Sequence, residues 1–171
     1  MRKVVVEKFD NNWKLEFEKE KRIVRSILGK NVMEIYHIGS TAVEGLSAKP
    51  IIDMMPVVQD IHHVDRCNEE MTTSGYEPKG ENGIPGRRYF QKGGDERSHH
   101  VHVYEKGSAE IKRHLAFRDY LRCHPVARMK YSNIKEELAL KFPDDIASYI
   151  KGKDEFVRNL EMEALDWYRS K

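Results

Sequence analysis

The chain has 171 residues, of which 39% are hydrophobic and 34% charged, and its formal net charge is +2. That length suits one domain with its own core, and the mixture of charge signs argues against disorder. It also predicts no extended nucleic-acid surface, although a few local cations suffice to bind a small anionic ligand. No apolar run approaches the ~20 residues that span a bilayer, and residues 1–10 lack a signal-peptide core, so we expect a cytoplasmic protein without a membrane partner. The two cysteines form no motif, and we expect both thiols to be reduced.

The first part of the chain is predicted to form one helix and two strands. Apolar residues recur at helical spacing over residues 13–28, and Gly29 suits the end of that helix. Residues 32–38 alternate as a strand does, and a short helical or irregular connection follows. Residues 51–58 form a second strand, apolar nearly throughout as in a strand covered on both faces, and only Asp53 interrupts it.

The rest of the chain is predicted to form a hairpin between helices. Asp60 is expected to cap a helix that reaches about Ser74. Residues 87–92 and 98–105 are expected to pair around a glycine-containing turn. Three helices follow, from Ser108 to about Cys123, from Pro125 to Pro143, and a last amphipathic one that carries Phe156 and Trp167. The pattern predicts an α/β (α+β) fold with a small mixed sheet flanked by helices and a helical C-terminal half.

Gly39 and Ser40 lie at the turn that follows the first predicted strand. Glycine lets a ligand approach the backbone, serine adds a hydroxyl donor, and a helix starting there adds positive potential, so the pair suits a phosphate. The alternative is a tight turn in which Ser40 only caps the helix.

Asp53 is an ionisable residue within an apolar strand. A buried carboxylate costs several kcal/mol unless something compensates its charge. A bound divalent cation compensates it well, since Mg²⁺ prefers carboxylate and phosphate oxygens. A salt bridge to Lys49 or to an arginine is the structural alternative.

The segment that holds these residues has the sequence HIGSTAVEGLSAKPIID at residues 37–53 and resembles the signature of the GrpB-like family. The likeness continues through Arg88–Phe90, His100–Val103 and Phe117–Arg122 to Tyr131, Lys135 and Leu138, and so covers nearly the whole chain. The resemblance implies one domain over residues 1–171 with the fold of the nucleotidyltransferases of the DNA polymerase β type.

That superfamily pattern, as the resemblance implies it, is a Gly-Ser turn that holds nucleotide phosphates, followed by a strand with two metal-binding acids two residues apart. Gly39, Ser40 and Asp53 match it. Position 55 is Met55 rather than an acid, and a thioether is a poor ligand for Mg²⁺. The departure puts a two-metal arrangement in doubt.

His100 and His102 are two residues apart on a predicted strand, so both rings project from one face. If that strand lies beside the one with Asp53, the three side chains can converge on a metal, and the set suits Zn²⁺, Mn²⁺ or Fe²⁺ better than Mg²⁺. Alternatively, the imidazoles bind phosphate, transfer a proton, or simply occupy a solvated strand face.

Three basic residues are candidates for phosphate binding, namely Lys49, Arg88 and Arg118. Lys49 lies at the entrance of the Asp53 strand, where it can neutralise phosphate or pair with Asp53. The arginines offer two-pronged donors, and for Arg118 the alternative is a pair with a neighbouring acid such as Asp119.

Together these residues lead to a hypothesis of metal-dependent transfer of a nucleotidyl group from a nucleoside triphosphate to an unknown acceptor. Gly39, Ser40, Lys49, Arg88 and Arg118 would bind phosphate. A divalent cation would be held by Asp53, His100 and His102, and it would be Mg²⁺ or Mn²⁺, with Zn²⁺ as a further option. Alternatively, a histidine would transfer the proton of the reaction. The alternatives are a non-catalytic nucleotide or phosphate binder without the second acid, and a metal-dependent hydrolase using Asp53 with the histidines. The sequence leaves the acceptor, the base preference and the oligomeric state open.

Overall fold

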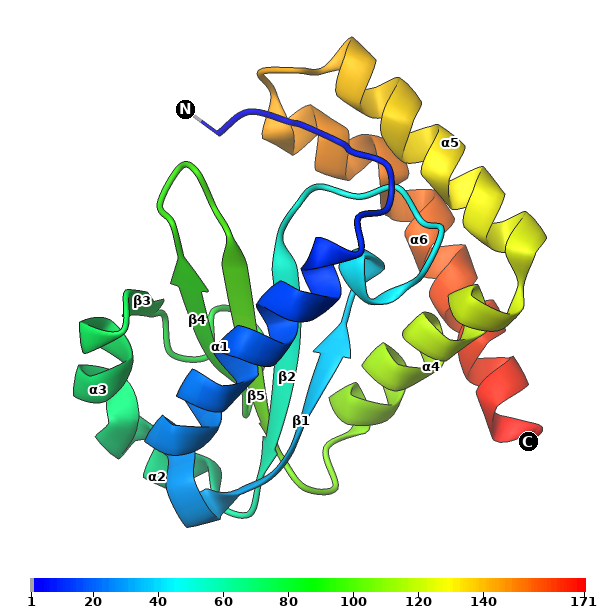
Figure 1. Cartoon of the computed structure of the whole chain (residues 1–171). Coiled ribbons are helices and arrows are strands. Elements are labelled where there is room, and N and C mark those ends of the chain that lie inside the picture. The colour runs from blue at the N-terminus through cyan, green and yellow to red at the C-terminus, as the bar shows by residue number, and fades with distance from the viewer. Residues whose placement is uncertain (1) are drawn as a thin grey trace.

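The computed structural model describes residues 2–171 and contains a mixed five-stranded sheet flanked by helices (Figure 1). The strand order is β1-β2-β5-β4-β3; β2 and β5 run parallel and the other neighbours antiparallel. The strands are β1 (Val32–Ile38), β2 (Ile52–Val58), β3 (Tyr76–Pro78), β4 (Arg88–Lys92) and β5 (His99–Glu105). The helices are α1 (Asn12–Leu28), α2 (Ile61–Val64), α3 (Asn68–Thr73), α4 (Ala109–Cys123), α5 (Pro125–Lys141) and α6 (Ile146–Arg169). The predicted mixed sheet and helical C-terminal half are confirmed.

The alternation of β2 decides which face of the sheet carries the candidate site. Ile52 and Met54 belong to the core that packs against α1, with Trp13 and Phe17. Met55 belongs to the opposite core beneath α4, where it packs with residues such as Tyr104. Because successive side chains of a strand point to opposite faces, Asp53 lies on the face that α4 covers. In Figure 1, α1 crosses the front of the sheet and α4, α5 and α6 stand to its right.

The α1 face contains one buried polar cluster. Glu20 of α1 is 3% exposed and accepts hydrogen bonds from the Tyr76 hydroxyl at 2.8 Å and the Lys92 ammonium at 2.9 Å. Burial disfavours the charge of Glu20, but these two partners outweigh burial and lower the pKa of the carboxyl. The cluster ties α1 to β3 and β4.

Two local features differ from the prediction. The helix expected from Asp60 to Ser74 is two short helices joined by a 3-10 turn at Asp65–Cys67, although Asp60 caps α2 as expected by accepting from the His62 N–H. Strand β3 was not predicted, because three residues that include Pro78 carry too little pattern. The turn after β1 is one 3-10 turn, Ser40–Ala42, as the expected short helical or irregular connection allows.

Residues 4–8 tie distant parts of the chain together. The N–H of Val4 donates to the carbonyl of Pro143 in the turn before α6, and Glu7 forms an isolated β-bridge with Ala48. Lys8 pairs with Glu136 of α5 at 2.6 Å. This segment therefore fastens the α5–α6 pair to the loop that precedes β2.

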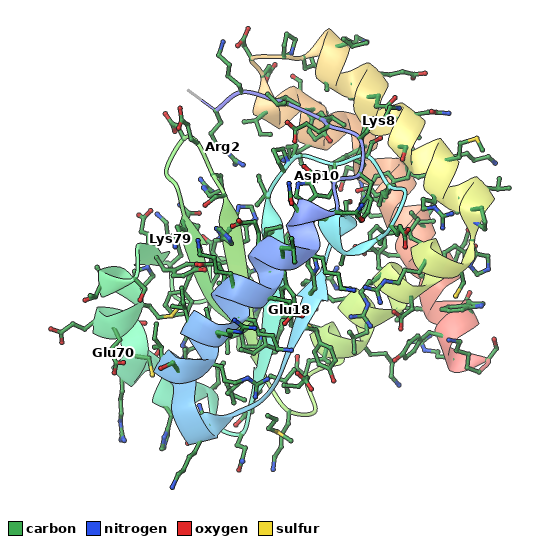
Figure 2. All side chains as sticks on the ribbon, in the orientation of Figure 1. Arg2, Lys8, Asp10, Glu18, Glu70 and Lys79 are labelled. Carbon is green, nitrogen blue, oxygen red and sulfur yellow. The ribbon has the colours of Figure 1, made fainter. Side chains whose placement is uncertain are left out.

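Charged side chains such as Glu18, Glu70 and Lys79 are exposed on the outside of these elements (Figure 2). Within residues 2–171, no helix is both long enough and apolar enough to cross a membrane.

Candidate functional site

Asp53 of β2 and two histidines of β5 converge as the sequence suggested. Asp53 pairs with His100 in the parallel register, and His102 lies two residues further along the same face of β5. The Asp53 Oδ1 atom is 3.2 Å from His100 Nδ1 and 3.0 Å from His102 Nε2. The prediction that the two strands are neighbours and that the imidazoles reach the carboxylate is confirmed.

Each imidazole has an arginine on its other side. Arg97 Nη1 lies 3.2 Å from His100 Nε2, and Arg87 Nη1 lies 3.3 Å from His102 Nδ1. One carboxylate and two guanidinium groups are thus linked through two imidazole rings. Sequence reasoning missed both arginines, because neither belongs to a motif.

The carboxylate of Asp53 is stabilised by hydrogen bonds from the histidines rather than by a salt bridge to Lys49. Burial disfavours ionisation of this carboxyl, but the hydrogen bonds from His100 and His102 outweigh burial, so its pKa lies well below the ordinary value. About a quarter of the side chain, 26%, remains exposed, so a ligand can reach it. The salt bridge to Lys49 that the sequence left open is not formed.

Gly39 brings the turn after β1 against Asp53. Its backbone has φ 72°, and a Cβ atom there would lie 2.9 Å from Asp53 Oδ2, so glycine is required on both counts. Ser40 follows and lines the same pocket. Since the helix beyond is a single 3-10 turn, the positive potential expected from a helix N-terminus is not available to this turn.

The pocket between the sheet and the C-terminal helices has a volume of about 260 Å³. Its sheet side is lined by Gly39, Ser40, Asp53, His100 and His102. Across from them it is lined by residues of α4, α5 and α6, among them His114, Tyr131, Lys135, Tyr149 and Lys153.

Three lysines gather at the helical side of this pocket. Lys135 is 2% exposed, and its ammonium has no hydrogen-bond partner within residues 2–171. It lies 4.2 Å from the centre of the Tyr131 ring, while Lys49 lies 5.2 Å from that of Tyr149. Lys153 is 6.0 Å and 5.9 Å from the centres of these same rings.

Burial and neighbouring cations depress the pKa of two of these lysines, Lys135 and Lys49. Burial, followed by the charges of Lys153 and Lys49, lowers the pKa of Lys135 well below its ordinary value. Burial, followed by Lys153, lowers the pKa of Lys49 to about 8. For both lysines the effect of neighbouring cations on the pKa exceeds that of the nearest carboxylate, Glu136 or Asp53, and such a cluster is suited to an anionic ligand.

Lys153 and His114 were missed by sequence reasoning. His114 lies beside His102, with ring centres 5.7 Å apart. Burial, with Arg113 next in effect, lowers the pKa of His114 to about 3, so its imidazole is neutral near pH 7. Both residues sit on helices without a readable motif, and only the packing of α4 and α6 brings them to the pocket.

Two predicted phosphate-binding residues lie elsewhere. Arg88 points to the other face of β4 and pairs with Asp65 at 2.7 Å. Arg118 is bound to the Asp119 carboxylate, the alternative weighed above, and to the backbone oxygen of His37. The strand alternation explains the first difference, since Arg87, one residue earlier, is the one that reaches the pocket face.

Asp53, His100 and His102 form a possible metal site. One ligand atom from each lies within 4.8 Å of the others, a spacing that a single ion can bridge. Two imidazoles and one carboxylate fit Mn²⁺, Zn²⁺ or Fe²⁺ better than Mg²⁺, which prefers an all-oxygen set. Met55 cannot add a ligand, because it is fully buried beneath α4.

Known proteins share both the sequence and the fold of this chain. The UPF0157 protein YqkA of Bacillus subtilis is 47% identical over 99% of this chain, which spans about half, 50%, of that protein's length. The crystal structure of the conserved protein GrpB from Enterococcus faecalis has a TM-score of 0.93 and 44% identity, and the match covers 96% of this chain and 99% of that one.

A more distant structure shows the fold class. Cid1, in complex with its short product ApU, matches 71% of this chain and 39% of its own with a TM-score of 0.50 and 15% identity, so the likeness is one of fold. The chain therefore has a nucleotidyltransferase-like fold. The model described as GrpB protein matches residues 3–163, and the chain belongs to the GrpB family.

Proposed function

We propose that this chain transfers a nucleotidyl group from a nucleoside triphosphate to an acceptor bound near the same pocket. The observation that carries the proposal is the pairing of a possible cation site with three lysines across one pocket, on a fold shared with Cid1. A triphosphate is a polyanion, and the lysines supply positive charge on one side of the pocket while a bound cation would supply it on the other.

Each part of the pocket has a distinct task in this proposal. The Ser40 hydroxyl donates a hydrogen bond to one phosphate group, and the close packing of Gly39 against Asp53 places that phosphate beside the cation that Asp53 would hold. Lys135, with Lys49 and Lys153, neutralises the remaining phosphate charge. Asp53, His100 and His102 would hold a divalent cation, which when bound supplies Lewis-acid polarisation of a phosphoryl oxygen.

Met55 supports a second candidate, a nucleotide or phosphate binder without catalysis. The strand position that would carry a second acid is filled by a core side chain, so residues 53 and 55 cannot hold two ions between them. In this candidate the pocket binds phosphate and a cation through the same residues, but it does not catalyse transfer.

Calorimetry with ATP, CTP, GTP and UTP, each with Mn²⁺, tests the binding that both candidates share. We expect Asp53→Asn to abolish the Mn²⁺-dependent part of nucleotide affinity, because the carboxylate is the anionic ligand of the site. Asp166→Asn, an exposed change on α6, is the matched control. Equal Mn²⁺ dependence in the wild type and Asp53→Asn would overturn the proposed site.

Product analysis separates the reactions. The protein is incubated with α-labelled nucleoside triphosphate, Mn²⁺ and a small-molecule cell extract that supplies acceptors. Label in a new compound together with released pyrophosphate indicates nucleotidyl transfer. Release of inorganic phosphate or free nucleoside monophosphate indicates hydrolysis, and binding without turnover indicates the non-catalytic binder.

A further inference from the structure

We propose that Arg87 and Arg97 hold the two imidazoles in tautomers that oppose cation binding, so that a cation enters only when these arginines release the rings. This inference rests on the proposed cation site and adds two positioning residues to it. It follows from the direction of four hydrogen bonds around Asp53.

Arginine fixes the direction of two of these hydrogen bonds. A guanidinium group has donors and no acceptor. His100 Nε2, 3.2 Å from Arg97 Nη1, and His102 Nδ1, 3.3 Å from Arg87 Nη1, must therefore accept. A neutral imidazole that accepts at one nitrogen carries its hydrogen on the other.

The remaining two hydrogen bonds then run toward Asp53. His100 donates through Nδ1 and His102 donates through Nε2, both to Oδ1. The two histidines are thus opposite tautomers, each selected by its arginine. Their N–H groups point at the place where a cation would need nitrogen lone pairs.

Cation binding reverses both tautomers. His100 Nδ1 and His102 Nε2 become ligands only when their hydrogens move to the outer nitrogens of the same rings, so the number of protons is unchanged. The outer N–H groups then face guanidinium N–H groups, donor against donor. Metal-bound histidines ordinarily donate their outer N–H to a carboxylate, a carbonyl or water, which is the opposite of this arrangement.

Loop backbone atoms anchor both arginines. Arg87 donates to the carbonyls of Glu81 and Asn82 at 3.1 Å and 2.8 Å, and its guanidinium lies 4.8 Å from the centre of the Tyr89 ring. Arg97 donates through Nε to the carbonyl of Gly94 at 3.0 Å and is only half-buried. Arg97 is therefore the arginine whose removal disturbs the fold less.

Arg97→Gln tests the inference through cation affinity, with Arg97→Lys as its matched control. Glutamine removes the obligate donor and the positive charge, and its carbonyl can accept from the outer N–H of a metal-bound His100. Lysine remains a charged donor. Calorimetry with Mn²⁺ and with Zn²⁺ on the nucleotide-free protein should show tighter binding to Arg97→Gln by about 10-fold or more, the scale on which such outer partners change metal affinity. Arg97→Lys should bind like the wild type.

Nitrogen NMR of the histidine side chains tests the same inference without metal. We expect His100 to carry its hydrogen on Nδ1 and His102 on Nε2 in the metal-free protein, and His100 to shift toward the other tautomer in Arg97→Gln. The opposite tautomers in the wild type would overturn the inference whether or not the variants are stable.

The outcomes separate this inference from the proposed function. Equal cation affinity of wild type, Arg97→Gln and Arg97→Lys would overturn the arginine effect and leave the cation site in place. Failure of all three to bind Mn²⁺ or Zn²⁺ would overturn the cation site itself, and with it this inference.

Discussion

Replacing Lys135 with methionine should make the ligand-free chain more stable and weaken its binding of a nucleoside triphosphate. Methionine keeps the unbranched apolar stem and removes an ammonium that is 2% exposed and has no hydrogen-bond partner within residues 2–171. An unsatisfied buried polar group costs about 1–3 kcal/mol, so the free energy of unfolding should rise by about that amount. For a chain of this size each kcal/mol raises the melting temperature by about 2–4 °C.

The stability gain should depend on pH in a defined direction. In the folded chain, burial and then Lys153 and Lys49 hold the pKa of Lys135 below 10.5, the ordinary lysine value. The unfolded chain therefore binds more protons between the two pKa values, and the stability of the wild type rises with pH in that interval. Lys49, whose pKa is about 8, acts in the same direction but is present in both proteins. The advantage of Lys135→Met should thus be largest near pH 7 and shrink toward pH 10.

Thermal melts between pH 7 and 10 and calorimetry with ATP and Mn²⁺ measure the two effects. Loss of a hydrogen bond to a charged group costs about 1.5–3 kcal/mol, which weakens binding by about 10- to 100-fold. Lys130→Met, an exposed change on the same helix, should alter neither property. A Lys135→Met protein that melts lower than the wild type and binds ATP equally well would refute the reasoning. It would mean that the ammonium, 4.2 Å from the centre of the Tyr131 ring, stabilises the fold.

Three further changes probe other parts of the structure. Gly39→Ala should lower stability by about 1–3 kcal/mol through backbone strain, and it should also weaken Mn²⁺ binding in calorimetry because the new Cβ would crowd Asp53. The control Gly80→Ala, at φ 60° with open space around it, should lower stability without affecting Mn²⁺ binding. Ser40→Ala should weaken ATP binding by about 1–2 kcal/mol if its hydroxyl holds phosphate, and unchanged affinity would place the phosphate elsewhere. Glu20→Gln should lower stability by about 1–3 kcal/mol above pH 5, because it weakens the hydrogen bonds that the buried Glu20 accepts from Tyr76 and from the half-buried Lys92. The folded pKa of Glu20 is lowered, so denaturant titrations should show this difference shrinking as pH falls below 4.5, where the wild-type carboxyl also takes up its proton.

The sequence predicted most of the sheet and the centre of the site, because both depend on local patterns. Residues 32–38 and 51–58 carry strong strand signals, and a single carboxylate in an apolar run marks Asp53 without any structure. The spacing of His100 and His102 predicts that they share a face, and the register of β2 with β5 then brings them to Asp53. These inferences needed only the alternation of side chains between the two faces of a β-strand.

The helical side of the pocket could not be predicted in the same way. Lys135 and Lys153 lie on different helices, and their meeting depends on the packing of α5 against α6, which no local pattern fixes. The choice of Arg88 over Arg87 shows a second limit. A one-residue difference in a strand moves a side chain to the other face, and sequence boundaries are uncertain by more than that.

The attachment of residues 4–8 supports the pocket from outside it, through contacts with Pro143, Ala48 and Glu136. The pocket has one wall on the sheet and one on the helices, and this segment spans both parts without lining the cavity. Exchanging the buried Val4 for a polar residue should weaken one of the contacts that hold the α5–α6 pair, while Ser47 still hydrogen-bonds to Ser132 and Glu136 and the side chains that line the pocket stay the same. We expect such a change to raise ligand exchange rates more than it alters the chemistry of the pocket.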